Sequence, residues 1–341
     1  MNCLIFFKRC TFILLLFCCA CNNHEERKVQ RSFYWWKTVF KLSDKEQQTL
    51  KGLSVQKLYV KFFDVDWDSQ NRSALPVAKS IFSQAPLANI TITPVVFITQ
   101  EPLQFLDEKG LDSLAVNLAN LLSSIATNNQ LPLSNEIQLD CDWTQTTKEA
   151  YFYLINGLKQ QSFFQNKIVS ATIRLHQLKF VSQSGVPPVD RGLLMCYNMG
   201  NLRHPQTKNS IIDEGELKKY INNLETYKLP LDVALPIFDW WVLFDGDQYR
   251  GLVREFDQGE RWKGKERIQF DRDTIIKGFS FKAGQWLRHE TSDAAAVKRC
   301  AELVADKLKS KELSVILYHL NEKDLTKIDG HALQNLFDSF H

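Results

Sequence analysis

The 341-residue sequence predicts an α/β fold, a (β/α)8 TIM barrel with a small β-rich insertion after the seventh strand. Short runs rich in Val, Ile, Phe, Tyr and Trp alternate with segments of helical periodicity, as expected for βα units around a parallel sheet. Eight strands with intervening helices fit a closed barrel. We count about eight such runs, at residues 33–40, 57–68, 92–99, 136–143, 168–178, 192–198, 232–241 and 313–320.

Apolar residues at three- and four-residue steps predict the helices between these strands, because this spacing places them on one buried face. Two short faces lie within residues 151–158 and 217–224. A further helix is predicted over residues 292–311, with Ser292 or Asp293 as N-cap, and a last one follows Asp329. The longest face consists of Leu111, Leu114, Leu118, Leu122 and Ile125.

The segment from about residue 245 to about residue 290 interrupts this alternation. It is charged, aromatic and punctuated by Gly, which predicts a β-rich insertion between the seventh strand and its helix. The segment is too short for a second domain. We therefore expect a leader over residues 1–20, a polar tether over 21–32, and one barrel domain over 33–341.

The first twenty residues predict a secretory signal. Lys8 and Arg9 precede an apolar run that is too short to span a membrane, and small residues follow it. The segment resembles a bacterial lipoprotein signal, although Cys18 stands where Leu is usual, three residues before the acylated Cys. An ordinary signal peptide is the alternative. The resemblance implies lipidation of Cys21 and anchoring in the bacterial cell envelope, at the periplasmic side of a membrane or at the cell surface.

The charge and the spacing of potential metal ligands limit the kinds of molecule that the protein is expected to bind. A formal net charge of +3, from 42 Lys and Arg against 39 Asp and Glu, gives no basic excess for a nucleic-acid partner. The carboxylates of the second strand lack the Gly and terminal Glu of a calcium loop. We expect neither a metal nor a cofactor. No metal-ligand spacing relates the cysteines beyond Cys21, which are Cys141, Cys196 and Cys300.

Two aspartates lie in the otherwise apolar strand "EIQLDCDWT", residues 136–144. Because strand side chains alternate, Asp140 and Asp142 share one face with Gln138 and Thr144, and the apolar residues share the other. In a barrel the polar face points into the interior and towards the mouth at the carboxyl ends of the strands. Barrel enzymes place their catalytic groups there, so we expect both aspartates at the mouth.

Other strand ends bring further polar and aromatic residues to this mouth. Arg174 of the fifth strand is a natural counter-charge for Asp140 or Asp142 and would lower the pKa of the carboxylate. For any single residue, a hydrogen-bond network that merely fills the barrel is the alternative. As a set, these residues favour a ligand-binding mouth. The remaining candidates are Asp64, Asp66, Tyr197, Asn198, Asp239 and Trp240.

The strand "IQLDCDWT" resembles the fourth-strand signature of the chitinase-type family 18 glycoside hydrolases, which ends in a catalytic glutamate. The two inner aspartates of that signature fall on Asp140 and Asp142. "LMCYN" similarly resembles the family's sixth-strand Met-any-Tyr-Asp motif, with Met195 and Tyr197 matching and Asn198 replacing Asp. "ALPIFDWW" resembles its seventh strand, which an insertion follows in many members. The resemblance implies a carbohydrate-active barrel.

The sequence departs from this family at the catalytic acid, whose position is Thr144. A threonine cannot protonate a leaving glycosidic oxygen at neutral pH. The family relies on substrate-assisted chemistry, in which one acid protonates the leaving group and the preceding Asp orients the substrate's N-acetyl group. The chain also resembles a family of secreted bacterial barrel proteins of unknown function that keep the "QLDxD" strand and lack the glutamate.

Three functions are compatible with these observations, and the sequence leaves the first two nearly level. The first is a glycosidase-like hydrolase in which Asp142 is acid or electrostatic stabiliser and Asp140 and Tyr197 lie behind it. Its second carboxylate would come from Asp64, Asp66 or Asp239. The second is a non-catalytic lipoprotein that binds a poly- or oligosaccharide through tryptophans at the cleft. The third is a structural envelope component with a vestigial pocket.

Overall fold

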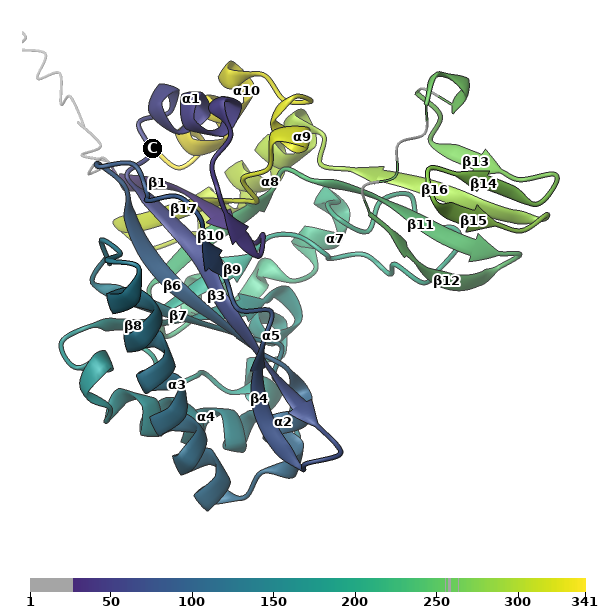
Figure 1. Ribbon diagram of the computed structural model, residues 1–341. Coiled ribbons are helices and arrows are strands. Elements are labelled where there is room, and N and C mark those ends of the chain that lie inside the picture. Colours follow the sequence, from purple (N-terminus) through teal and green to yellow (C-terminus); the bar gives the residue numbers. More distant parts are fainter. Residues whose placement is uncertain (1–26, 255, 257–258, 263) are drawn as a thin grey trace, which may run out of the picture.

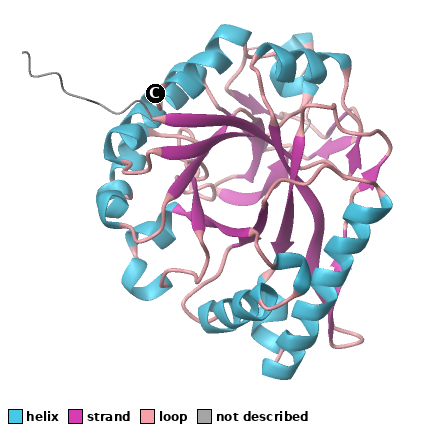
Figure 2. Cartoon of the chain, turned by 90° about the vertical axis from the view of Figure 1, so that its left-hand side faces the viewer, coloured by secondary structure: helices cyan, strands magenta, loops and turns pink. Residues whose placement is uncertain are grey.

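The computed structural model describes residues 27–254, 256, 259–262 and 264–341. Eight parallel strands close a barrel, because β1 pairs with both β17 and β3, and helices cover its outside (Figures 1 and 2). The predicted (β/α)8 fold is confirmed. In order around the barrel the strands are β1 (Lys28–Trp35), β3 (Lys57–Asp68), β6 (Thr91–Ile98), β7 (Glu136–Cys141), β8 (Ile168–Arg174), β9 (Arg191–Met195), β10 (Leu231–Pro236) and β17 (Glu312–Tyr318).

The helices begin at the capping residues that the sequence offers. Asp107, Asp293 and Asp329 each accept a hydrogen bond from a backbone N–H of the first helical turn, at α3, α8 and α10. The apolar face predicted for the longest helix is buried, except that Ile125 is half-buried. The helices are α1 (Asp44–Gly52), α2 (Gln100–Phe105), α3 (Glu108–Asn128), α4 (Lys148–Lys159), α5 (Leu175–Lys179), α6 (Val181–Ser184), α7 (Glu214–Lys218), α8 (Ala294–Lys307), α9 (Glu322–Leu325) and α10 (Gly330–Asp338).

The predicted leader and the candidate lipidation residue Cys21 lie outside the described residues. Within the described part of the chain, no helix combines the length and the apolar character needed to cross a membrane.

The insertion begins at Asp239 rather than near residue 245. The run "ALPIFDWW" looks like one strand in the sequence, but β10 ends at Pro236 and the chain turns before the next strand starts. A separate apolar cluster that includes Trp241 and Leu287 stabilises the insertion, which projects from the barrel as a smaller lobe (Figure 1). Its strands are β11 (Asp239–Asp245), β12 (Gln248–Val253), β13 (Arg267–Gln269), β14 (Thr274–Ile276), β15 (Phe279–Phe281) and β16 (Gln285–Thr291).

The end of the second barrel strand forms a hairpin. β3 covers the predicted residues 57–68 and pairs at its end with the antiparallel strand β4 (Ser73–Val77). A register shift between Lys61 and Phe63 accompanies this change of direction, as expected of a β-bulge. β2 (Val39–Phe40) and β5 (Ile81–Phe82) form a short parallel pair beside it.

Charged side chains fill the floor of the barrel, the interior at the amino ends of the strands. Lys57 Nζ lies 2.5 Å from Glu136 Oε2, and Ser170 Oγ donates to Glu136 Oε1 at 2.6 Å. Arg191 Nη1 lies 2.7 Å from Asp232 Oδ1. Each of these four charged side chains therefore has an oppositely charged partner.

Candidate functional site at the barrel mouth

A cavity of about 570 Å³ opens at the carboxyl ends of the strands, which we call the mouth. Its walls combine aromatic rings with charged and amide side chains from the barrel, the insertion and the loop after β17. Six of the residues proposed from the sequence line it: Asp140, Arg174, Tyr197, Asn198, Asp239 and Trp240. The aromatic lining consists of Trp36, Phe97, Tyr197, Phe238, Trp240 and Tyr318.

Asp140 is the buried carboxyl of the mouth. Thr172 Oγ1 of the neighbouring strand donates to its Oδ1 at 2.7 Å. Burial raises the pKa of Asp140 to about 6, the nearby Asp142 and Asp64 carboxylates add to that, and the Arg174 charge and the Thr172 hydrogen bond oppose it. Asp140 therefore changes charge near pH 6 and is a proton donor below it.

Asp142 lies at the rim of the mouth, paired with Arg174. Arg174 donates from Nε to Asp142 Oδ1 and from Nη2 to Oδ2, the latter at 3.1 Å, so Asp142 carries the counter-charge that the sequence suggested. Burial acts to lower the pKa of Arg174, but the Asp142 and Asp140 carboxylates raise it above its ordinary value. The Asp142 side chain is 48% exposed and is not among the residues that line the cavity.

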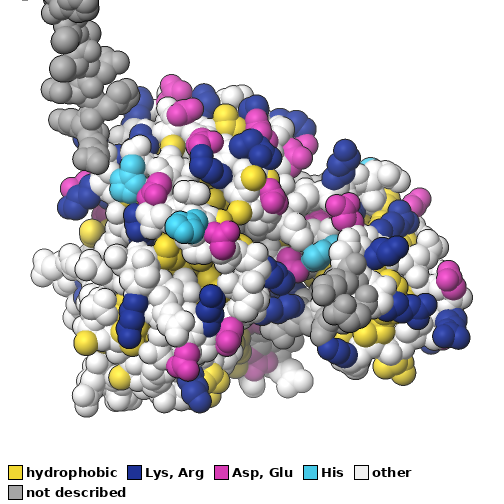
Figure 3. Space-filling model, turned by 90° about the horizontal axis from the view of Figure 1, so that it is seen from above, with side chains coloured by type: hydrophobic (Ala, Val, Ile, Leu, Met, Phe, Trp, Pro, Cys, Tyr) yellow, Lys and Arg dark blue, Asp and Glu magenta, His cyan; other side chains and the backbone are white. Residues whose placement is uncertain are grey.

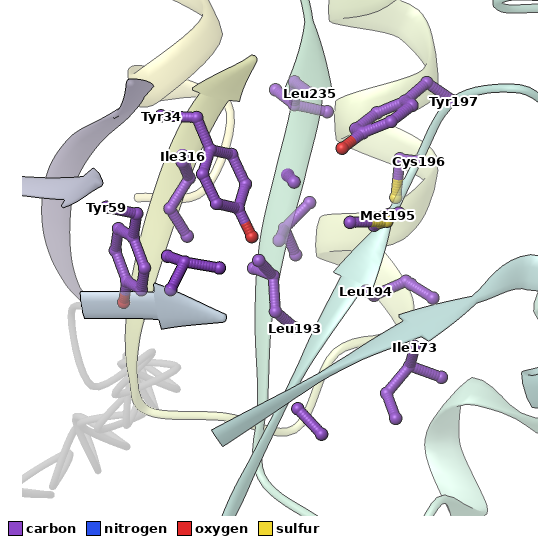
Figure 4. Packing of buried hydrophobic residues seen from close by; sticks show 14 of the residues in the cluster. Tyr34, Tyr59, Ile173, Leu193, Leu194, Met195, Cys196, Tyr197, Leu235 and Ile316 are labelled. Atoms are coloured by element: carbon purple, nitrogen blue, oxygen red, sulfur yellow. The ribbon is translucent and has the colours of Figure 1, made fainter. Parts of the chain in front are cut away.

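Tyr197 follows β9 and reaches into the barrel interior, as does Tyr34 from β1 (Figure 4). The Tyr197 side chain is buried, and its hydroxyl has no hydrogen-bond partner among the described residues. Burial raises its pKa well above the ordinary value. Its ring packs against Tyr318 with centroids 5.4 Å apart. Asn198, the next residue, adopts a φ of 56°, a left-handed conformation that Asn tolerates better than most residues.

Asp239 and Trp240 reach the mouth from β11 of the insertion, not from the end of the seventh barrel strand. Asp239 Oδ2 lies 2.7 Å from His289 Nε2, and Asp239 Oδ1 accepts a hydrogen bond from Lys327. Burial acts to raise the pKa of Asp239, but the hydrogen bonds and charges of these two partners lower it overall. Trp240 Nε1 donates to Glu290 at 2.8 Å. Asp239 is thus a carboxylate that stays ionised.

Asp64 and Asp66 do not line the mouth cavity. Asp64 forms an ion pair with Lys61 at 2.9 Å, and Asp66 accepts a hydrogen bond from Thr99 Oγ1 at 3.0 Å. In the register of the sheet Asp64 is the partner of Phe97, and Phe97 is the partner of Asp140, so Asp64 lies on the inward face although it does not line the cavity. Asp66 lies further along β3, where the strand pairs with β4 in a hairpin.

Thr144 lies in the turn before α4. Its backbone N–H donates to Thr147 Oγ1 at 3.0 Å, and its hydroxyl lies 2.9 Å from that of Thr146. The Thr144 side chain is exposed and does not line the cavity. Trp143, beside it, is buried beneath α4 and stacks on Tyr151 with centroids 5.2 Å apart, so it faces the helices as alternation predicts.

Several residues of the mouth were not singled out from the sequence. Trp36, Phe97 and Tyr318 are aromatic residues at or near strand ends, and the rule applied to the carboxylates would have found them. Arg254, His319 and Lys323 come from loops and from α9, where no alternation guides a prediction. Among the described residues, no group of three or more His, Cys, Asp or Glu side chains is placed to hold a metal ion.

No protein-family model and no curated protein matches this sequence. Several solved structures do match its fold. The C-terminal domain of a putative chitinase from Desulfitobacterium hafniense DCB-2 is 9% identical with a TM-score of 0.57, and covers 92% of this chain and 100% of its own. The spore cortex-lytic enzyme SleL from Bacillus megaterium QM B1551 is 12% identical with a TM-score of 0.54, covering 92% of this chain and 74% of its own.

A third match is a GH18 chitinase from Cycas revoluta, solved in complex with (GlcNAc)4. It is 12% identical with a TM-score of 0.52, and covers 92% of this chain and 100% of its own. At such identities the likeness concerns the fold alone. The chain is therefore a TIM barrel whose fold is similar to the chitinase and SleL structures, and its activity has to be argued from its own residues.

Proposed function

We propose that this protein binds an oligosaccharide at the barrel mouth. The observation that carries the proposal is the cavity of about 570 Å³, which has aromatic walls and a buried Tyr197 hydroxyl without a partner in the described part of the chain. Aromatic faces pack against the apolar faces of sugar rings, and a few placed polar groups fix their orientation. A chitinase of similar fold was solved with (GlcNAc)4 bound, which supports a carbohydrate as the ligand class.

The pairing of the acidic residues favours binding over hydrolysis. Asp142 is committed to two hydrogen bonds from Arg174, and Asp239 is kept ionised by His289 and Lys327. Asp239 therefore lacks a proton that it could transfer to a leaving glycosidic oxygen, and both oxygens of Asp142 accept hydrogen bonds. Thr144, which stands where the resemblance places the family's acid, has only a hydroxyl and does not line the cavity.

Glycoside hydrolysis is the second candidate, and Asp140 is the observation that favours it. Asp140 lines the cavity and has a pKa raised to about 6, so it retains its proton in mildly acidic solution, as a general acid requires. In that case Asp140 would protonate the leaving group, with Asp142 and Tyr197 behind it.

Titration calorimetry with a panel of oligosaccharides, including chitooligosaccharides, distinguishes these functions. The protein is the chain from residue 22 onwards, which lacks the leader and the lipid. We expect binding without release of reducing ends at pH 5.5. Trp36→Ala should weaken binding about tenfold, because its half-buried ring lines the mouth. Trp67→Ala is the matched control, since Trp67 packs on Phe105 outside the cavity.

Two results would change the assignment. Release of reducing ends that Asp140→Asn abolishes would establish the hydrolase instead of the binding protein. Failure of every glycan in the panel to bind would reject both functions and leave a structural component of the envelope.

We further propose that the mature chain is a lipoprotein of the bacterial cell envelope, anchored through Cys21. The support is the sequence pattern before Cys21. Metabolic labelling with an alkyne fatty acid should mark the wild-type chain, and Cys21→Ser should lose the label and leave the membrane fraction.

A further inference from the structure

His319 forms part of the wall of the mouth and is flanked by cations. It follows β17, lines the cavity, and has a buried Nδ1 atom without a partner among the described residues. Burial and the nearby charges of Lys37 and Arg254 lower the pKa of His319 to about 4. The imidazole is therefore neutral at physiological pH, and the wall around it carries a positive potential.

Two of the cations on this wall form no ion pair with any described residue. Lys37 lies 2.6 Å from Glu46, which neutralises it. Within the part of the chain that the structure describes, neither Arg254 nor Lys323 has an ion-pair partner, although both line the cavity. Seen from above, Lys and Arg side chains gather where the barrel meets the insertion lobe (Figure 3).

The carboxylates of the mouth are engaged elsewhere. Asp239 is held by His289 and Lys327, and Lys327 also lies 3.8 Å from Asp324. Asp140 accepts a hydrogen bond from the Thr172 hydroxyl and lies near Arg174. None of the three forms an ion pair with Arg254 or Lys323 within the described residues, so these two cations remain available to a ligand.

We propose that the mouth takes an acidic glycan, and that Arg254 and Lys323, with the His319 imidazole beside them, bind the carboxylate of one of its sugars. This inference rests on the proposed oligosaccharide binding and names the class of oligosaccharide. The guanidinium of Arg254 offers paired N–H donors that match the two oxygens of a carboxylate. Lys323 adds a second charge, and the neutral imidazole adds a hydrogen bond.

The test compares two oligosaccharides of equal length by calorimetry. One is a hexasaccharide of alternating glucuronate and N-acetylglucosamine, and the other is neutral chitohexaose. The chain from residue 22 onwards should bind the acidic hexasaccharide about tenfold more tightly at 50 mM salt. The preference should shrink to about threefold or less at 500 mM salt, because ions screen an exposed charge pair.

Substitutions test which side chains bind the carboxylate of the acidic sugar. Arg254→Gln combined with Lys323→Gln should abolish the preference, because it should lower the affinity for the acidic hexasaccharide more than the affinity for chitohexaose. Lys309→Gln is the control, because Lys309 is exposed and lies before β17, at the floor end of the barrel. Circular dichroism checks that each variant is folded.

Three results would contradict different parts of the proposal. Equal or tighter binding of chitohexaose by the wild type would overturn the inference while oligosaccharide binding stands. A preference that survives in the double variant would overturn the assignment to Arg254 and Lys323. Failure of both hexasaccharides and of the wider panel to bind would remove the proposed function and this inference together.

Discussion

The floor and the mouth of this barrel both contain buried polar side chains, but they differ in how these side chains are paired. At the floor, Glu136 of β7 accepts hydrogen bonds from Lys57, Tyr59 and Ser170. At the mouth, Tyr197 and His319 each have a buried polar atom without a partner among the described residues, and a cavity of about 570 Å³ opens beside them.

The difference separates a structural role from a binding role. A buried polar group that lacks a partner costs about 1–3 kcal/mol, so a fold retains such groups where something else compensates, as a ligand does. The charged side chains at the floor are paired with each other and need no ligand. Glu136 and Asp140 lie on one face of one strand, and yet only Asp140 faces a cavity, which is why the comparison can be tested residue by residue.

The largest expected effect is at the floor. Lys57→Met should lower the free energy of unfolding by about 3–5 kcal/mol, because it leaves the buried Glu136 carboxylate without its counter-charge. Urea denaturation measures this, and the glycan affinity of the folded protein should be unchanged. Lys28→Met is the control: its pair with Glu312 is 78% and 68% exposed and should contribute less than about 1 kcal/mol. A loss below 1 kcal/mol for Lys57→Met would contradict the structural role of the floor.

A smaller effect concerns pH and Asp140. Its pKa is about 6 in the folded protein against the ordinary 3.8, so the folded state binds the proton more tightly than the unfolded state does. The stability contributed by this proton is fully present below pH 3.8 and is lost as the pH rises through 6, by about 3 kcal/mol in all. Asp140→Asn removes this dependence.

The measurement is the free energy of unfolding of both proteins at several pH values between 4 and 7.5. The stability of the variant relative to the wild type should increase as the pH rises. Taking this difference separates the contribution of Asp140 from those of Asp232 and Asp324, whose pKa values burial also raises to about 6. If the free energies of unfolding of the two proteins changed in parallel with pH, the pKa of Asp140 would not be raised by folding.

The smallest effect separates stability from binding. Tyr197→Phe removes a hydroxyl that has no partner among the residues the structure describes. Stability should therefore change by less than about 1 kcal/mol and can rise, while glycan affinity should fall about fivefold to tenfold. Tyr59→Phe is the matched change at the floor, where the hydroxyl donates to Glu136 at 3.1 Å. It should lose about 1 kcal/mol of stability and no affinity. The reverse pattern would remove the distinction between the two ends.

Much of the fold could be predicted because it depends on local patterns. The strand Lys57–Asp68 was predicted with its observed bounds, and the capping roles of Asp293 and Asp329 were read from the sequence. The boundary between β10 and β11 was not, because an apolar run that turns at Ile237 and Phe238 looks like one that continues straight. The bulge in β3 was not predicted either, because no residue type in that strand marks it.

The sequence by itself determined the barrel and the alternation in β7 that brings Asp140 to the mouth, because strand periodicity and helix spacing are local properties of the chain. The tertiary structure decided which neighbours each side chain meets. It paired Asp142 with Arg174, held Asp239 between His289 and Lys327, and left Arg254 beside His319 without a counter-charge among the described residues. Such pairings join residues far apart in the sequence, and the charge of a site depends on them.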